Sequence, residues 1–143
     1  MKLIVLAGKE HCGKTQCLNK LACKIEKETY INPSKISKGN NDWEYIFFNE
    51  GKKIKLVIST WGDYPWLLKE CCEKYHDYDA VVCACNLKFM RGRIYKPFED
   101  AMKFDLYATI VMKAEEEDID KQEIANEQCS NYLLSLIKHF RIF

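Results

Sequence analysis

The sequence of 143 residues has few glycines and prolines, no long hydrophobic run and almost no net charge. No apolar stretch approaches the roughly 18 residues that a membrane-spanning helix needs. The five apolar residues before Gly8 are too few for the core of a secretory signal. We therefore expect a cytoplasmic protein that does not bind membranes. The net charge of +1 and a single adjacent basic pair, Lys52–Lys53, give no electrostatic argument for a nucleic-acid partner.

The eight cysteines include no C-x-x-C pair, and the histidines are not spaced as zinc ligands. In a reducing cytoplasm the cysteines would remain thiols, and we interpret most of them as small buried hydrophobes. With three prolines and six glycines, the chain also has no linker-like segment. We expect a single domain over residues 1–143, in which 48% apolar residues supply the core.

Hydrophobic periodicity predicts strands that alternate with helices. The strands are expected at 2–7, 43–48, 53–59, 79–85 and 106–112, and the helices at 14–26, 64–75, 96–103 and from an acidic run at 115–120 onward. The glycine in "NEGK" predicts a hairpin between the second and third strands, whereas the polar segment 27–43 is expected to be a mobile loop. This order predicts an α/β fold of three layers, with a mostly parallel five-stranded sheet, an antiparallel edge hairpin and helices on both faces.

The stretch "GKEHCGKT", from Gly8 to Thr15, matches G-x-x-x-x-G-K-[ST] at every fixed position, between a buried strand and an amphipathic helix. The glycines let the backbone approach an anion, the intervening amides can point inward, and the helix dipole adds attraction. Lys14 is expected to reach the β- and γ-phosphates, and the Thr15 hydroxyl to ligate Mg²⁺. The expected nucleotide contacts in this stretch are Gly8, Lys9, Glu10, His11, Cys12, Gly13, Lys14, Thr15 and Gln16. The alternative is a strand-to-helix turn that binds nothing, but such a turn needs neither the lysine nor the hydroxyl.

These residues resemble the Walker A loop of the P-loop NTPase superfamily. The resemblance implies a sheet whose first strand lies between the third and the fourth, with nucleotide at the carboxyl ends of the strands. It also implies an aspartate at the end of a neighbouring strand, holding Mg²⁺ through water. The segment "STWGDYP" at 59–65 lacks an aspartate at the matching position, so Asp63 is our candidate for the carboxylate. The alternative role of Asp63 is to cap the helix that begins near Pro65.

A second loop, "NLKFMRGRIYK" at 86–96, contains Arg91 and Arg93. Members of the superfamily use such arginines to clamp transferring phosphates, whereas the alternative interpretation is solvated surface charge. Asn86 stands at the strand end itself, but its amide does not indicate one particular role.

A third loop, "MKAEEED" at 112–118, occupies the position of the guanine-reading N-K-x-D motif in GTPases. Lys113 is retained, but Met112 replaces the asparagine, and a thioether cannot replace an amide in base recognition. ATP is therefore favoured over GTP, with the stem of Lys113 available to lie along the base.

Taken together, these features favour a nucleoside triphosphate-binding protein that requires Mg²⁺ and acts as a slow hydrolase or a switch. Residues 27–43 would sense the γ-phosphate, with Thr29, Ser34 and Ser37 as candidate contacts, and Lys14, Asp63, Arg91 and Arg93 would carry any catalysis. A nucleoside, nucleotide or small-molecule kinase is the alternative, in which Trp61, Tyr64 and Trp66 could line an acceptor pocket. A non-enzymatic nucleotide-binding module is a third alternative, and a protein partner or a homodimer is left open.

Overall fold

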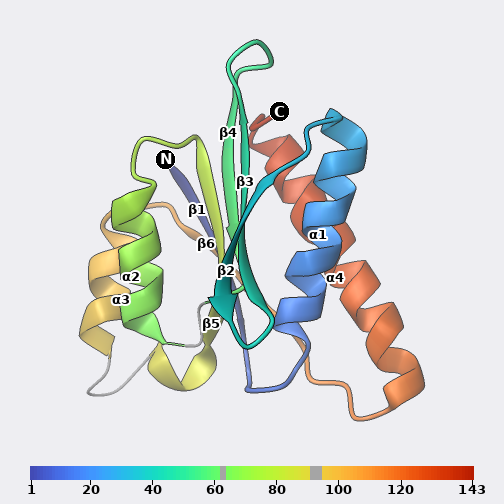
Figure 1. Ribbon diagram of the computed structural model, residues 1–143. Helices are drawn as coiled ribbons and strands as arrows, with labels where there is room; N and C mark the ends of the chain where they lie inside the picture. The colour runs from blue at the N-terminus through green and yellow to red at the C-terminus, as the bar shows by residue number, and fades with distance from the viewer. Residues whose placement is uncertain (62–63, 91–94) are drawn as a thin grey trace.

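The computed structural model describes residues 1–61, 64–90 and 95–143, and it has the expected α/β architecture (Figure 1). The strands are β1 (Lys2–Gly8), β2 (Ser34–Gly39), β3 (Asp42–Asn49), β4 (Ile54–Ser59), β5 (Ala80–Asn86) and β6 (Thr109–Met112). The helices are α1 (Lys14–Thr29), α2 (Pro65–Lys74), α3 (Tyr95–Met102) and α4 (Ile119–His139), with a 3₁₀ turn, η1, at Leu87–Phe89. Within the described part of the chain, no helix is both long enough and apolar enough to cross a bilayer.

The six strands form one mixed sheet in the order β2-β3-β4-β5-β1-β6. Strands β4, β5, β1 and β6 run parallel, whereas β2 and β3 pair antiparallel at one edge. The predicted hairpin between β3 and β4 is confirmed. Strand β1 pairs with β5 on one side and β6 on the other, so the segment that follows it leaves the sheet from an interior position.

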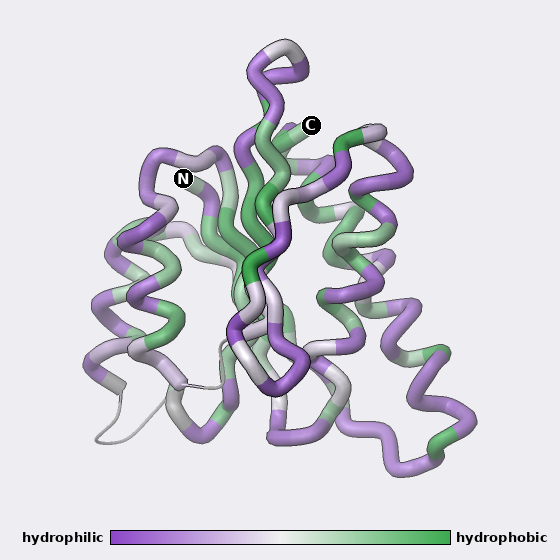
Figure 2. Tube along the Cα trace, viewed as in Figure 1, coloured by the Kyte–Doolittle hydropathy of each residue, from purple (hydrophilic) through white to green (hydrophobic). Residues whose placement is uncertain are grey.

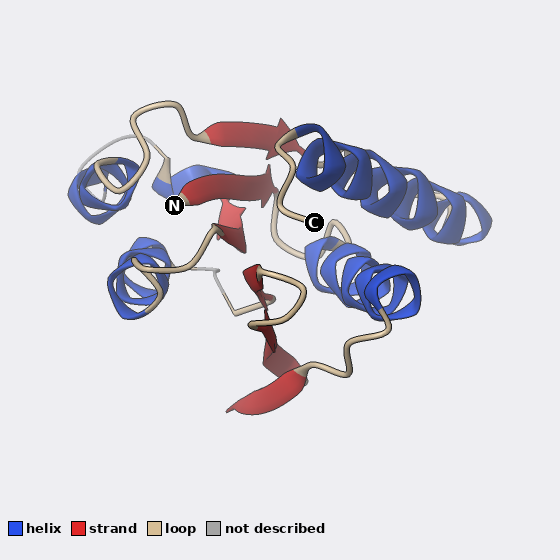
Figure 3. Ribbon diagram, turned by 90° about the horizontal axis from the view of Figure 1, so that it is seen from above, coloured by secondary structure: helices blue, strands red, loops and turns tan. Residues whose placement is uncertain are grey.

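Helices cover both faces of the sheet, with α1 and α4 on one side and α2 and α3 on the other (Figure 3). Alternate side chains of β1 supply both cores, because successive residues of a strand point to opposite faces. Ile4 and Leu6 pack in the core under α1 and α4, while Leu3 and Val5 pack in the core under α2 and α3. Figure 2 shows the apolar residues concentrated along the central strands and hydrophilic residues at the tips of the hairpins.

The sheet has six strands rather than five, because part of the segment expected as a mobile loop is strand β2. The prediction for 27–43 was wrong for a physical reason. β2 is an edge strand whose side chains are mostly exposed, so it has no apolar alternation for a periodicity argument to detect. Its order comes instead from backbone pairing with β3.

The turn between β2 and β3 consists of Asn40 and Asn41, both in the left-handed region, with φ of 48° and 63°. Two consecutive positive φ angles define a type I′ turn, for which asparagine is among the preferred residues. The dipeptide between "SKG" and "DWEYIFF" was therefore a usable hairpin signal.

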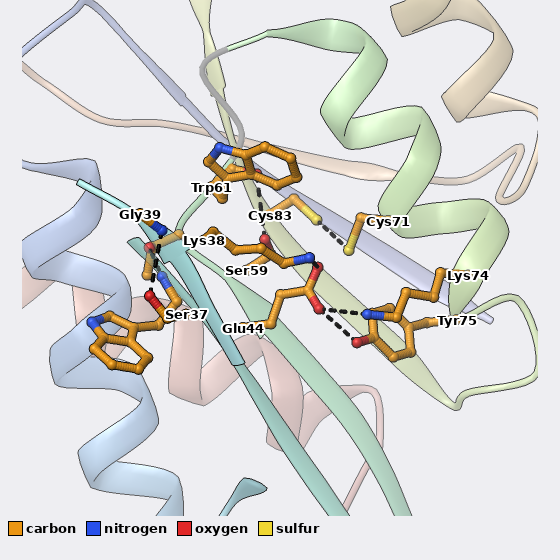
Figure 4. A network of polar contacts seen from close by, with 12 residues as sticks. Ser37, Lys38, Gly39, Glu44, Ser59, Trp61, Cys71, Lys74, Tyr75 and Cys83 are labelled. Carbon is orange, nitrogen blue, oxygen red and sulfur yellow. Dashed lines mark hydrogen bonds and ion pairs between the residues drawn. The ribbon is translucent and has the colours of Figure 1, made fainter. Parts of the chain in front are cut away.

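A buried carboxylate fastens this hairpin to the opposite layer (Figure 4). Glu44 on β3 is 2% exposed. It accepts hydrogen bonds from Tyr75 Oη at 2.6 Å and Lys74 Nζ at 2.9 Å, and pairs with Lys38 Nζ of β2 at 3.2 Å. The Lys38 ammonium also lies 5.0 Å from the centroid of the Trp61 ring. The network joins β2, β3 and the end of α2, and so limits how far the hairpin can move.

Several predicted boundaries also shift. Helix α1 continues to Thr29 rather than ending at residue 26, and β6 begins at Thr109 rather than residue 106. Helix α4 begins at Ile119, so most of the acidic run precedes it, and the Asp118 side chain caps it by accepting from the Asp120 amide. The interpretation of most cysteines as buried residues is confirmed for Cys17, Cys71, Cys72, Cys83 and Cys85.

Candidate functional site

The candidate site is the loop 9–13, which joins the carboxyl end of β1 to the first turn of α1. Gly8, the last residue of β1, is in register with Asn86 at the end of β5, and Ala7 is in register with Met112 at the end of β6. The loop therefore lies between two neighbouring strand ends, at the same end of the molecule as the β2–β3 turn (Figure 1). This is the edge of an open parallel sheet where ligands bind.

Lys14 folds back over the loop that precedes it. Its Nζ donates to the carbonyl oxygen of Lys9 at 2.7 Å and to that of Gly8 at 3.2 Å, and the residue is 5% exposed. Burying an ammonium costs free energy unless polar partners accompany it. The two carbonyls hold the charge at the base of the loop, where an incoming anion would meet it.

Helix α1 begins without a side-chain cap from any described residue. Its N-cap residue is Gly13, and no acidic residue lies in its first turn. The first N–H groups of a helix need a partner outside the helix and carry the positive end of its dipole. The start of α1 thus presents uncompensated donors beside the Lys14 ammonium, in contrast to α4, which Asp118 caps.

Both glycines of the motif are required by close contacts. A Cβ on Gly8 would lie 2.5 Å from Cys12 Sγ and 3.2 Å from Lys113 Cβ. Gly13 has a φ of +96°, and a Cβ there would lie 2.4 Å from Oδ1 of Asn126 on α4. His11 is also left-handed, with a φ of 60°. The loop is therefore held in a tight conformation between β6 and α4.

A cavity of about 310 Å³ opens in front of the loop. Lys14, Thr15 and Gln16 line it from the start of α1, and Asn40 and Asn41 line it from the tip of the β2–β3 hairpin. Glu10, His11 and Gly13 complete the lining. The β2–β3 hairpin and the start of α1 thus both contribute residues to this cavity.

Asn40 and Asn41 were not among the sequence-predicted site residues. The candidate γ-phosphate contacts in the same segment lie elsewhere. Thr29 is at the far end of α1, roughly 22 Å from its start by helix geometry, and its hydroxyl donates to the Ile25 carbonyl. Ser34 and Ser37 lie on β2, before its turn.

The strand end expected to carry the carboxylate is not next to β1 in the sheet. Strand β4 does not pair with β1, since β5 lies between them, so the loop that begins after Ser59 is one strand further from the loop 9–13. The strand end next to Gly8 carries Asn86, which is 4% exposed and accepts from the Lys88 amide, capping η1. Tyr64 occupies the N-cap position of α2, and Pro65 begins the helix as expected.

Three predicted catalytic residues, Asp63, Arg91 and Arg93, lie outside the described residues, so their roles stay predictions.

Two of the aromatic residues considered for an acceptor pocket lie against each other at the start of α2. Tyr64 and Trp66 stack with ring centroids 4.6 Å apart and are about half exposed.

Lys113 lies beside Gly8 at the start of the loop 9–13, but it is not among the described residues that line the cavity of about 310 Å³. Its amide donates to the Ala7 carbonyl at 2.7 Å, its Nζ donates to the Ala114 carbonyl at 3.2 Å, and the residue is 7% exposed. It lines a separate cavity between β6 and α4, together with Cys129. Contact with a base stays a prediction for this residue.

The Lys113 charge acts on a thiol pair below the loop. A hydrogen bond to Cys129 and burial raise the pKa of the Cys17 thiol well above its usual value. The same hydrogen bond lowers the pKa of Cys129, and the charge of Lys113 adds to that effect. Both thiols connect α1 to α4 beneath the site.

The comparisons with known proteins identify no relative of this chain: no protein-family model, no curated protein and no solved structure matches it.

Proposed function

We propose that this protein binds a nucleoside triphosphate, ATP in preference to GTP, through the loop 9–13 and the first turn of α1. The observation that carries the proposal is the position of Lys14. Its buried ammonium is anchored by two loop carbonyls, beside an uncapped helix start, at a cavity of about 310 Å³. Fixed positive charge and unpaired amide donors at one point are the features that bind phosphate.

The strand order supports a P-loop-like, three-layer arrangement. When only the parallel strands are counted along the chain, β1, β4, β5 and β6 are first to fourth, and β1 lies between the third and the fourth. This is the order that the resemblance to P-loop NTPases implies. The antiparallel strands β2 and β3 extend the sheet beyond that arrangement and bring Asn40 and Asn41 to the loop.

The side chains around the cavity fit a hard cation accompanying the phosphates. Thr15 offers a hydroxyl oxygen, and Asn40 and Asn41 offer amide oxygens, which are the donor types that Mg²⁺ accepts. We propose Thr15 as a direct Mg²⁺ ligand and Asp63 as the carboxylate acting through water. When bound, the ion would neutralise phosphate charge, while Lys14 holds the triphosphate against the loop.

Thermal unfolding with Mg²⁺ and ATP, GTP, ADP or GDP tests the proposal on wild type and Lys14→Ala. A ligand at about 100 times its Kd stabilises a protein by about 2.7 kcal/mol. We expect ATP to raise the Tm of the wild type by several degrees and to leave that of Lys14→Ala nearly unchanged. Lys69→Ala is the matched control, because it removes a partly exposed lysine that pairs with Glu73 on α2, and it should respond like the wild type.

An equal response of Lys14→Ala and wild type would place the nucleotide elsewhere, and no response of the wild type to any nucleotide would refute the proposal. If binding is found, phosphate release with and without a nucleoside or nucleotide acceptor separates slow hydrolysis from phosphoryl transfer. A nucleotide-binding module without enzymatic activity would give neither product.

A further inference from the structure

A second cavity, of about 350 Å³, adjoins the first on the α4 side of the phosphate loop. Gly13 and Gln16 line it from the loop and α1, while Gln122 and Asn126 line it from α4. His11, Gly13 and Gln16 border both cavities. A ligand whose phosphates reach Lys14 can therefore extend over Gly13 into this second space.

Asn126, which lines the second cavity, has a buried polar atom that packs against Gly13 and has no partner among the described residues. Asn126 is 6% exposed, and its Oδ1 is fully buried and accepts no hydrogen bond from any described residue. Buried polar atoms in folded proteins are nearly always hydrogen-bonded. The other eight buried polar residues of the described chain all have partners: Lys14, Thr29, Glu44, Ser59, Thr60, Asn86, Lys113 and Ser130.

The position of this amide is well determined by packing. Gly13 approaches so closely that its missing Cβ would lie 2.4 Å from Asn126 Oδ1 and 3.1 Å from Nδ2. Half a turn of the amide group exchanges the acceptor and the donor. Because one end of the amide packs against Gly13, such a turn decides which one of the two groups faces a ligand in the cavity.

The rest of the lining suits a flat heterocycle with a hydrogen-bonding edge. Gln16 and Gln122 add two carboxamides, and Ile119 adds an apolar side chain at the rim. The carboxylate of Glu123 also lines the cavity, but it forms an ion pair with Lys20, which offsets its charge. Adenine offers a donor at N6 on this edge, which an amide oxygen can accept, whereas guanine offers only the acceptors O6 and N7 there.

We propose that this cavity holds the adenine base of the nucleotide whose phosphates bind at Lys14, and that the Asn126 amide reads the edge of that base. The inference rests on the proposed function, because it requires the triphosphate to lie at the loop. It assigns base recognition to the last helix instead of to the loop at 112–118.

Calorimetric titration with Mg²⁺ and ATP, GTP or inorganic tripolyphosphate tests the inference on wild type, Asn126→Ala and Lys14→Ala. We expect the wild type to bind ATP about tenfold or more tightly than GTP, because GTP would leave the buried amide oxygen without a donor. Asn126→Ala should lose that preference and keep its affinity for tripolyphosphate, whereas Lys14→Ala should lose all three ligands. Gln128 is an exposed carboxamide on the same helix, and it lines the separate cavity between β6 and α4 that also contains Lys113. Gln128→Ala should therefore behave as wild type.

The outcomes separate the inference from the proposed function. If the wild type binds tripolyphosphate but does not prefer ATP to GTP, or if Asn126→Ala retains that preference, the inference is wrong while phosphate binding stands. If the wild type binds neither tripolyphosphate nor nucleotide, both fail. An effect of Asn126→Ala on tripolyphosphate equal to its effect on ATP would indicate that Asn126 only shapes the loop, and would also overturn the inference.

Discussion

Two buried polar side chains, Glu44 on β3 and Asn126 on α4, differ in whether their oxygens have hydrogen-bond partners. Glu44, on the β2–β3 side, has three partners from two other elements (Figure 4). Asn126, on the α4 side, is almost as deeply buried, and its Oδ1 has none among the described residues. A carboxylate costs more free energy to bury than an amide, and of the two groups it is the carboxylate that has partners.

The difference separates a network that stabilises the fold from a group for which we propose a ligand as the partner. A satisfied network stabilises a particular arrangement, and here it fixes the hairpin that carries Asn40 and Asn41. An unsatisfied buried group costs stability in the isolated protein and regains that cost only when a partner arrives. Substitutions on the two sides should therefore have opposite patterns, with Glu44 affecting stability and Asn126 affecting binding.

The largest effect is expected for Glu44→Ala. Removing the carboxylate leaves the Tyr75 hydroxyl buried and two lysines without their counter-charge, which should lower the free energy of unfolding by about 3 kcal/mol. This is the low end of the range for broken buried pairs, because Lys74 is partly exposed and can turn to water. Urea unfolding measures the change. Glu50→Ala, in the exposed β3–β4 turn, should change stability by less than about 0.5 kcal/mol; similar losses for both would contradict the comparison.

Gly13→Ala should cost about 2 kcal/mol, since alanine is strained at a φ of +96° and its Cβ would overlap Asn126. Shortening Asn126 on α4 would remove the overlap with the new Cβ but not the backbone strain at residue 13. The double variant Gly13→Ala/Asn126→Ala should therefore be more stable than the sum of the single effects predicts, with a coupling of about 0.5 kcal/mol or more by urea unfolding. Additive effects would mean that the Asn126 amide makes no steric contact with a Cβ at residue 13.

Acid should remove part of the Glu44 contribution. Burial alone would raise the pKa of this carboxyl, but the hydrogen bonds from Tyr75 and Lys74 and the charge of Lys38 outweigh it, so the pKa is lowered below its usual 4.5. A folded-state pKa below the unfolded-state value means that the ionised form stabilises the fold. The contribution is complete above about pH 4.5 and is lost as the pH falls through the folded-state pKa. Glu44→Gln should thus lose less stability than the wild type on acidification below pH 4.5, and parallel pH profiles would contradict this assignment.

The smallest effect on stability is expected for Asn126→Ala. No hydrogen bond to the buried Oδ1 is lost, and removing an unsatisfied polar atom offsets the packing that the amide provides. The Tm of the ligand-free variant should lie within about 2 °C of the wild type, which corresponds to about 0.5 kcal/mol. A loss as large as that of Glu44→Ala would show that Asn126 has a structural partner, and the contrast between the two sides would not hold.

Local patterns were sufficient for most elements and for the loop itself. The buried strand β1, the amphipathic helix α1 and the spacing of Gly8, Gly13 and Lys14 were all readable, because each depends on residues close together in the chain. Strand β2 was not found by hydrophobic pattern, since an exposed edge strand has none, although the Asn40–Asn41 turn was a signal that could have located it.

The site beyond the loop could not be predicted in the same way. The strand next to Gly8 is β5 and not β4, so the expectation about which strand end neighbours the loop 9–13 depended on an order that no single segment encodes. Asn126 carries no sequence signal, because an asparagine on one turn of an amphipathic helix is ordinary.

The sequence by itself determined that a tight, glycine-flanked turn with a lysine would follow a buried strand and begin a helix. Backbone conformation, helix start and local charge are short-range properties, and these residues specify them. The tertiary structure alone decided what surrounds that turn: the Asn40–Asn41 tip on one side, Asn126 on the other and Asn86 at the adjacent strand end. Those neighbours are brought together by sheet order and helix packing, which depend on the burial of apolar side chains from the whole chain.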